Sequence, residues 1–329
     1  MKVPHIIGAD LSKKTIDLAS HQLKSHLKID NNSSGFQDLI RWLKRLKINA
    51  AEVMIVMEHT GLYSYKLEQF LYHQSICFTK VSALAIKRSM GLVRGKTDKQ
   101  DAQRIARYGF EKLDQLTQSK PIDKKLQRLQ MLHSTRERLV RNRAGFTTAV
   151  KEYQQAFELS KTDPIIAPQL KLIKTLDLEI TKLDQHIESL VTEHSTLNEN
   201  YQLLQSIKGV GKVLATAALI KTENFTRFSN ARKFACFCGT APFENTSGTS
   251  IRRKTRISHL ADKGMKTLLD LSAKSAIQHD KELREYYLRR IQIGKSKRST
   301  INVVRNKIIY RMFAVIKRQT PYQPLQITS

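Results

Sequence analysis

The stretch VPHIIGADLSKKTIDLASHQLKSHLKIDNN (residues 3–32) contains three short segments with the composition of β-strands. VPHIIGADL is apolar enough to be a buried strand, and TIDLASHQ and HLKIDNN follow it after short polar turns. Runs of this length with so few residues between them are typical of neighbouring strands in a meander. We therefore expect the chain to begin with a small β-sheet whose first strand ends at Asp10.

The segments that follow alternate between helix and strand patterns. SSGFQDLIRWLKRL (33–46) has apolar residues at a helical period behind a serine cap region. EVMIVMEHTG (52–61) is a continuous apolar strand that ends at Glu58; a helical segment, YSYKLEQFLYHQ (63–74), and another strand, SICFTKVS (75–82), come next. With a further helix from about Thr97, this order predicts an α/β fold in which helices cover a mixed sheet.

The composition points to a partner that carries negative charge. The 329 residues include 57 Lys and Arg against 29 Asp and Glu, so the net charge is +28. Residues 201–329 hold 25 of these basic residues and only 7 of the acidic ones. Such a field favours a polyanion, most commonly nucleic acid. The alternative is a basic protein without catalytic activity, of the kind found in ribosomes. A hydrophobic share of 40% allows folded cores, so the chain is not a disordered tail.

The three cysteines predict neither a disulfide framework nor a zinc site. Cys236 and Cys238 are separated by one residue, and no second pair of Cys or His stands at zinc spacing, so we interpret them as small apolar residues. The N-terminus lacks the apolar core and cleavage pattern of a signal peptide, and no apolar run reaches the roughly 18 residues of a membrane span. We expect a cytoplasmic protein with no membrane partner.

The middle of the chain has the pattern of long helices. Apolar or tolerated residues recur at alternating spacings of four and three, which is typical of a coiled coil; they are Leu176, Ile180, Leu183, Ile187, Leu190, His194 and Leu197. An earlier helix with Leu126, Leu129, Leu132 and Leu139 is the expected partner, and the prolines at 164 and 168 mark the turn between the two. This predicts an antiparallel helical hairpin, or alternatively a helix that pairs with a second copy of the chain.

A glycine turn opens the basic C-terminal third. In LLQSIKGVGKVLATAALIK (203–221), Gly209 and Gly211 separate two helical segments, and Lys208 and Lys212 flank the turn. This is the pattern of a helix–hairpin–helix, in which backbone N–H groups and a helix start approach a phosphate. A plain turn that uses glycine for its backbone freedom is the alternative, and the basic context favours nucleic-acid binding by these four residues.

Four acidic residues form the most informative pattern. Asp10 and Glu58 each end an apolar strand, and Asp98 and Asp101 stand three residues apart, on one face of a helix. The pair alone could be exposed acids that suit the helix dipole. If the first and fourth strands are neighbours, however, all four meet at one sheet edge. Their repulsion would then be relieved by divalent cations, and two Mg²⁺ ions so held are suited to phosphodiester chemistry.

Three motifs resemble those of the RuvC-like domain in the DEDD transposases of bacterial insertion sequences. They are GADLSKKTIDLA (8–19), MEHTGLYSYKL (57–67) and GKTDKQDAQRIA (95–106). The segments QSIKGVGKVLATAALI (205–220) and FACFCGTAPFENTSGTSIRRKTRISHLADKGMKTLLDLSAKSAI (234–277) are similar to that family's C-terminal transposase domain. The family includes pilin-gene invertases and bridge-RNA-guided serine recombinases. The resemblance implies an RNase-H-like (RuvC-like) fold for the N-terminal domain, with Asp10, Glu58, Asp98 and Asp101 as metal ligands.

The resemblance also implies a serine nucleophile. In APFENTSGTSIRRKTRISH (241–259), Ser247 matches the serine that joins covalently to a DNA strand end in that family. From the residues alone, Ser-Gly after Asn-Thr is a common turn, and Ser250 is not excluded by chemistry. The cations Arg252, Arg253, Lys254 and Arg256 follow within nine residues and are candidates to hold the phosphate.

Aromatic residues among the late cations have two interpretations. Tyr286, Tyr287 and Tyr310 could stack on unpaired bases or belong to a helix core. We expect Tyr310 to be a core residue. We expect His59, next to Glu58, to orient a neighbour rather than act as a base.

We expect three domains: a RuvC-like catalytic domain (1–118), a helical hairpin or coiled coil for assembly (119–200), and a mostly α-helical basic transposase domain (201–329). The resemblance implies a nucleoid-associated bacterial DNA recombinase that cuts and rejoins donor and target double-stranded DNA with Mg²⁺ or Mn²⁺, guided by a structured noncoding RNA. Because recombination holds two duplexes, we expect a dimer or tetramer. The alternatives are a metal-dependent junction endonuclease that uses water, and a non-catalytic nucleic-acid-binding scaffold.

Overall fold

The computed structural model describes residues 4–59, 61–89, 91, 95, 97–247, 251–258 and 260–323; for 244–247 and 251–256 it describes the backbone. The chain folds as two compact units, Met1–Ile122 and Asp123–Ser329. Among the residues that the structure describes, none of the helices combines the length and apolarity that a bilayer crossing requires.

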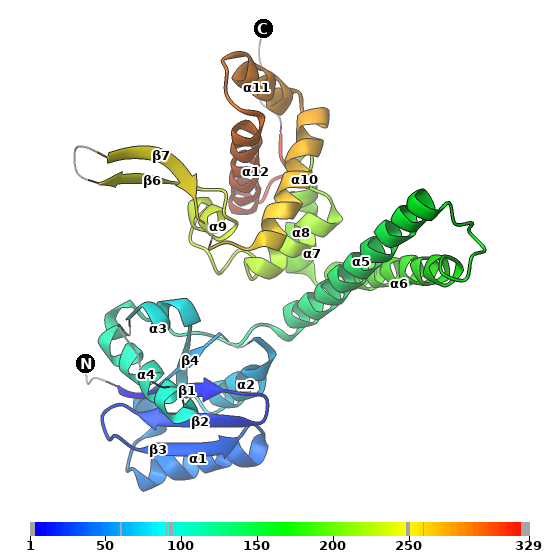
Figure 1. The fold of residues 1–329 in the computed structure, drawn as a ribbon. Coiled ribbons are helices and arrows are strands. Elements are labelled where there is room, and N and C mark those ends of the chain that lie inside the picture. Colours follow the sequence, from blue (N-terminus) through cyan, green and yellow to red (C-terminus); the bar gives the residue numbers. More distant parts are fainter. Residues whose placement is uncertain are drawn as a thin grey trace. The chain divides into compact units, whose positions relative to one another are not determined.

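The first unit is a five-stranded mixed sheet with helices on both faces (Figure 1). Its elements in chain order are β1 (His5–Leu11), β2 (Thr15–Ser20), β3 (His26–Asp30), α1 (Ser33–Arg45), β4 (Val53–Glu58), α2 (Tyr65–His73), β5 (Cys77–Val81), α3 (Ala83–Ser89) and α4 (Asp98–Glu111), with short 3₁₀ turns η1 (Ala50–Glu52), η2 (Gly61–Tyr63) and η3 (Leu113–Gln115). The strand order is β3-β2-β1-β4-β5, in which β1 pairs antiparallel with β2 and parallel with β4. The expected meander and the mixed α/β sheet are confirmed.

The two faces of this sheet are buried by different helices because strand side chains alternate. Ile7, Ala9 and Met57 belong to the large apolar cluster that includes the buried faces of α1 and α2. Ile6 and Val56 belong to a second cluster that includes residues of α3 and α4. Asp10 lies four residues after Ile6, and Glu58 lies two residues after Val56. Because side chains an even number of residues apart in a strand share a face, both acids stand on the face that α3 and α4 cover.

The second unit begins with two long helices that pack on each other. Its elements are α5 (Lys124–Phe157), α6 (Ala167–Thr192), α7 (Ser195–Gln205), α8 (Lys212–Lys221), α9 (Ala231–Phe237), β6 (Pro242–Ser247), β7 (Ile251–Ile257), α10 (Lys263–His279), α11 (Lys281–Gln292) and α12 (Lys297–Arg318). Arg136 and Arg143 of α5 form ion pairs with Asp184 and Asp177 of α6, which fixes the register of the hairpin.

The regular spacing through residue 197 does not correspond to one helix. α6 ends at Thr192, His194 precedes α7, and α7 then crosses residue 200. No glycine or proline marks this break, and Leu197 is nevertheless buried, so the spacing continues across two helices. The division of the chain into three domains stays a prediction.

The segment after α9 forms a β-hairpin that the sequence pattern does not predict. β6 and β7 form an antiparallel hairpin between α9 and α10 in the chain. Its base is attached to α12, because the side-chain amides of Asn302 and Asn306 donate to the Thr240 carbonyl oxygen at 2.8 and 2.9 Å.

Candidate active site

Asp10 and Glu58 leave the sheet side by side. β1 and β4 are parallel neighbours, and their register pairs Ala9 with Met57, so the next residue on each strand is the acid. Parallel strands end at the same edge of a sheet, and both side chains stand on the face of α4. The condition on which the four-acid hypothesis depends, adjacent first and fourth strands, is therefore met.

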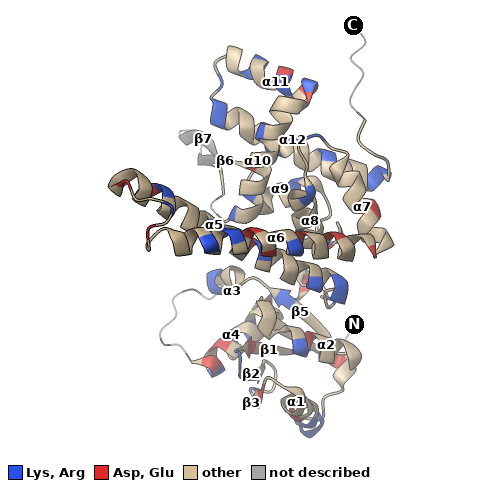
Figure 2. Cartoon of the chain, turned by 90° about the vertical axis from the view of Figure 1, so that its right-hand side faces the viewer, with Lys and Arg blue, Asp and Glu red and all other residues tan. Residues whose placement is uncertain are grey.

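Helix α4 brings its own two acids to the same place. Thr97 caps the helix by accepting from the Gln100 N–H at 3.2 Å, so Asp98 and Asp101 fall in the first turn. Figure 2 shows the acidic start of this helix in red. Gly8 allows α4 to lie directly on β1, because a Cβ at this position would stand 2.2 Å from the Ala102 carbonyl oxygen.

The four carboxylates line one cavity of about 570 Å³. Its other lining residues are Ala83, Ile86, Lys87, Gly91, Gly95, Arg104 and Ile105. The lining thus combines four acids, two cations and the apolar residues Ala83, Ile86 and Ile105. Ionisable groups gathered in a partly apolar cavity are typical of a catalytic or ligand-binding site.

The acids influence one another electrostatically. The pKa of Asp10 is raised from its ordinary value of 3.8 to about 6, chiefly by burial and then by the nearby charges of Asp101, Asp98 and Glu58, in that order. Such mutual repulsion is what bound cations relieve. The donor set fits a hard divalent cation, since each carboxylate offers two oxygens and Mg²⁺ prefers oxygen ligands.

Two cations currently neutralise the helix pair. Arg104 donates to Asp101 at 2.7 Å and also to the Gly95 carbonyl oxygen at 3.0 Å, and Lys28 lies 3.8 Å from Asp98. In the part of the chain that the structure describes, no group of three His, Cys, Asp or Glu side chains stands close enough to hold a metal ion as it is. Cation binding at the four acids therefore requires their side chains to turn towards a common point.

A fifth acid beside the pocket was missed in the sequence. Asp17 of β2 pairs directly with Asp10 across the strands and is buried. It accepts from His26 at 2.7 Å, and Lys28 lies 3.4 Å from it and bridges to Asp98. Hairpin register, which places Asp17 opposite Asp10 and Lys28 opposite Asp17, is the signal that could have found this row.

The candidate nucleophile lies in the second unit. Ser247 is the last residue of β6 and pairs with Ile251, so it ends a strand. Ser250 lies outside the described residues, and so do the side chains of Ser247, Arg252, Arg253, Lys254 and Arg256. The backbone places all four cations on β7, with Arg252 opposite Thr246 and Arg256 opposite Phe243.

The glycine turn between α7 and α8 has two different glycines. Gly209 has a φ of +90°, and a Cβ there would stand 2.6 Å from the Ser272 carbonyl oxygen of α10. This glycine therefore has a packing role. Gly211, at the N-terminus of α8, has open space around its Cβ position. Lys208 and both glycines line a cavity of about 500 Å³, in which the buried Ser272 hydroxyl has no partner among the described residues.

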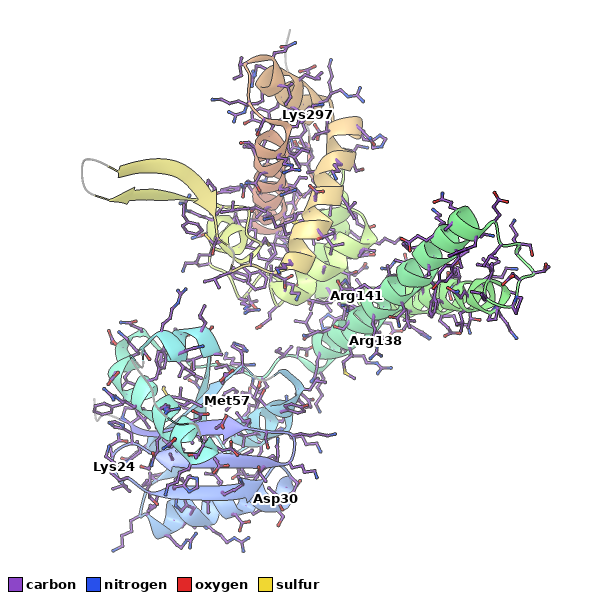
Figure 3. The ribbon with its side chains drawn as sticks, viewed as in Figure 1. Lys24, Asp30, Met57, Arg138, Arg141 and Lys297 are labelled. Atoms are coloured by element: carbon purple, nitrogen blue, oxygen red, sulfur yellow. The ribbon has the colours of Figure 1, made fainter. Side chains whose placement is uncertain are left out.

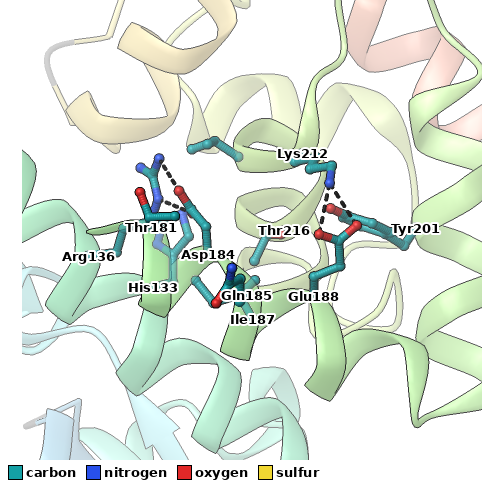
Figure 4. Close-up of a pocket in the computed structure, with 11 residues that line it drawn as sticks. His133, Arg136, Thr181, Asp184, Gln185, Ile187, Glu188, Tyr201, Lys212 and Thr216 are labelled. Carbon is teal, nitrogen blue, oxygen red and sulfur yellow. Dashed lines mark hydrogen bonds and ion pairs between the residues drawn. The ribbon is translucent and has the colours of Figure 1, made fainter. Parts of the chain in front are cut away.

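Lys212 already has a protein partner. Its ammonium lies 2.7 and 2.8 Å from the two carboxylate oxygens of Glu188 on α6, beside Tyr201 (Figure 4). Both side chains are exposed, so the pair is weak enough for another anion to compete.

The tyrosines of the last two helices are divided between two environments. Tyr310 is 52% exposed, so the expectation of a core residue was wrong. Tyr286 stacks with cations instead: Lys307 lies 4.6 Å and Arg289 5.7 Å from the centre of its ring.

Comparisons with known proteins agree with the motifs. Residues 7–156 match the model of the DEDD transposases of IS110 type, described as "Transposase", and residues 201–288 match the model described as "Transposase IS116/IS110/IS902 family". The chain is 28% identical to the pilin gene-inverting protein of Moraxella bovis, over 96% of this chain and 97% of that protein. It is 24% identical to the transposase for insertion sequence element IS1111A of Coxiella burnetii, over 69% of this chain and 68% of that protein.

Proposed function

Because this chain belongs to the family of DEDD-type insertion-sequence transposases, and is thus an enzyme of DNA recombination, we propose that Asp10, Glu58, Asp98 and Asp101 form its metal-binding catalytic site. The observation that carries the proposal is the single cavity lined by all four carboxylates. The cofactor is Mg²⁺, with Mn²⁺ as the alternative.

The four carboxylates would hold the cations at the sheet edge. When bound, divalent ions offset the charge that develops on the attacking and leaving oxygens of a phosphodiester. Arg104 and Lys87, which line the same cavity, are placed to contact a phosphate oxygen. Arg104 is the better candidate, because its planar guanidinium can leave Asp101 and pair bidentately with a phosphate.

Ser247 is the proposed nucleophile. Its hydroxyl oxygen forms a bond to phosphorus, the bond from phosphorus to a sugar oxygen breaks, and the hydroxyl proton leaves to a base while the sugar oxygen gains one. The attachment of the β6–β7 hairpin to α12 through Thr240 supports a defined position for Ser247. Arg252, Arg253, Lys254 and Arg256 share the hairpin with it and would hold the strand being joined.

The remaining parts of the proposal concern partners. Lys208, Gly209, Gly211 and Lys212 bind a DNA phosphate at the start of α8, with Gly209 contributing the backbone turn; the unpartnered Ser272 hydroxyl in that cavity supports this. A structured noncoding RNA guides the choice of donor and target DNA. The α5–α6 hairpin mediates assembly into a dimer or tetramer, in which carboxylates of one copy face the serine of another.

Substitution of Ser247 distinguishes this mechanism from a junction nuclease that uses water. We expect Ser247→Ala to abolish strand exchange and the covalent protein–DNA adduct, and Ser250→Ala to retain both. The adduct is measured by mass spectrometry of peptides after incubation with DNA and the RNA encoded beside the gene. Retained cleavage by Ser247→Ala, with no adduct in the wild type, would identify the nuclease.

A further inference from the structure

Two exposed turns stand together at the sheet edge that carries Asp10 and Glu58. The first is the β1–β2 turn, which presents Lys13 and Lys14 to solvent. The second is η2, which starts three residues after Glu58 and presents Leu62 and Tyr63. We call them the paired turns.

Asn31 joins the paired turns through one side chain. Its amide nitrogen Nδ2 donates to the Ser12 carbonyl oxygen at 2.9 Å and to the Tyr63 carbonyl oxygen at 3.0 Å. Its backbone N–H donates to the Lys14 carbonyl oxygen at 2.8 Å. A side-chain amide has only two N–H donors, so Asn31 uses both of them to hold one turn against the other.

Each turn is also held from within. In the first, the Ser12 backbone N–H and hydroxyl reach the Thr15 carbonyl oxygen at 2.9 and 2.8 Å. In the second, the Ser64 hydroxyl lies 3.2 Å from the Gly61 carbonyl oxygen and 2.7 Å from the carboxylate of Glu68.

Glu68 is itself fixed, because it is buried and forms a 2.8 Å ion pair with Lys80 of β5. The paired turns are therefore ordered by specific contacts before any partner binds.

These ordered turns expose apolar side chains to water. Leu62 is 72% and Tyr63 46% exposed, although both follow a residue of the catalytic pocket closely in the chain. A single exposed leucine needs no explanation. An exposed leucine and tyrosine beside two lysines, on turns tied together by a dedicated amide, have the composition of a site for a single nucleic-acid strand, in which cations follow the backbone and an aromatic ring stacks on a base.

We propose that the paired turns bind the DNA strand next to the phosphate being cleaved. Lys13 and Lys14 contact its phosphates, Tyr63 stacks on an unpaired base with Leu62 packing against it, and Asn31 is the positioning residue. The choice of strand rests on the proposed function, because that function places a DNA phosphate at Asp10 and Glu58.

Photocrosslinking of the full-length protein tests this without requiring catalysis. The probe is a 12-nucleotide DNA strand of 5-iododeoxyuridine, irradiated in the presence of EDTA, and crosslinked peptides are identified by mass spectrometry. We expect a crosslink at Tyr63. Because EDTA removes metal chemistry, failure of the metal site would not affect this result. Crosslinks confined to other regions would overturn the proposal, and a Tyr63 crosslink with the matching RNA strand alone would overturn its assignment to DNA.

Variants then separate contact from folding. Leu62→Ala should lower the Tyr63 crosslink several-fold relative to crosslinks within residues 201–329. Asn31→Asp, which keeps the shape but removes both donors, should lower that ratio about as far. The control is Leu23→Ala with Tyr72→Ala, which changes two other exposed residues. Leu23 precedes Lys24 in the chain, and Lys24 lies near the start of β3, whereas Asp30 ends this strand (Figure 3). If the control lowers the ratio as much as Leu62→Ala, or Asn31→Asp leaves it unchanged, the proposed arrangement is wrong.

Discussion

Gly8 of β1 and Ala102 of α4 approach so closely that a Cβ on Gly8 would stand 2.2 Å from the Ala102 carbonyl oxygen. The same Cβ would stand 2.3 Å from the Ala106 backbone nitrogen. Since Asp10 lies two residues after Gly8, and Asp101 immediately precedes Ala102, this contact sets the distance between the strand acids and the helix acids.

Gly8→Ala should therefore move α4 away from the sheet. The neighbouring atoms are backbone and cannot give way, so we expect a loss of about 3 kcal/mol in the free energy of unfolding and a large loss of strand-exchange activity. The measurements are chemical denaturation and a recombination assay. Gly145→Ala is the control: a Cβ there meets nothing within 4 Å in helix α5, so stability should be unchanged or rise by up to about 1 kcal/mol. An active, fully stable Gly8→Ala protein would contradict this role.

Asp10→Asn should stabilise the protein in EDTA while it removes activity. The pKa of Asp10 is raised from 3.8 to about 6, chiefly by burial, so the folded state holds this proton more tightly than the unfolded state. The wild-type protein therefore loses the stability contributed by protonated Asp10 as the pH rises from about 4 to about 6. At higher pH, the buried carboxylate keeps the free energy of unfolding at this lower value.

A pKa change of this size corresponds to about 3 kcal/mol. Because the group is only half-buried, solvent screening should reduce the gain to roughly 1–2 kcal/mol at pH 8. Denaturation at pH 5 and pH 8 measures it, and the advantage of Asp10→Asn must grow with pH. Asp38→Asn, at an exposed pair with Arg41, should show no such growth.

Lys80→Met should destabilise the first unit strongly. The substitution leaves Glu68 buried without its cation, which typically costs 3–5 kcal/mol. Urea denaturation measures the loss. Arg107→Met, which breaks an exposed pair with Glu111, is the matched control and should change stability by less than about 1 kcal/mol. Equal effects of the two substitutions would show that burial of the Glu68 pair is unimportant.

Glu188→Gln should strengthen DNA binding at low salt. The substitution frees Lys212 from a carboxylate that holds it at 2.7 and 2.8 Å, so the lysine becomes fully available to a phosphate. We expect affinity for duplex DNA to rise about two- to fivefold, since an exposed pair is worth at most about 1 kcal/mol. Glu179→Gln, on the same helix and paired with Lys182, should leave affinity unchanged. A fall in affinity with Glu188→Gln would argue against a phosphate contact by Lys212.

The fold of the first unit was predictable because its strands are short apolar runs with clear turns. What the sequence left open was which strands are neighbours, since the pairing of β1 with β4 joins segments more than forty residues apart. Asn31 could not be recognised as a link between two turns for the same reason: its partners Ser12 and Tyr63 are set by tertiary structure.

The second unit was harder to read for two physical reasons. β6 and β7 were missed because the run of cations at 252–254 hides the alternation that marks a strand. The packing role of Gly209 could not be predicted, because its close approach to Ser272 depends on α10, a helix that begins only at Lys263. Local patterns cannot report such a contact.

The most direct test of the central claim is a titration of the full-length protein with Mn²⁺, followed by electron paramagnetic resonance. If Asp10, Glu58, Asp98 and Asp101 hold the cation, changing any one of them to its amide should weaken Mn²⁺ binding roughly tenfold or more. The exposed Asp114→Asn should bind as the wild type does. Binding that is unaltered in all four amide variants would contradict the account.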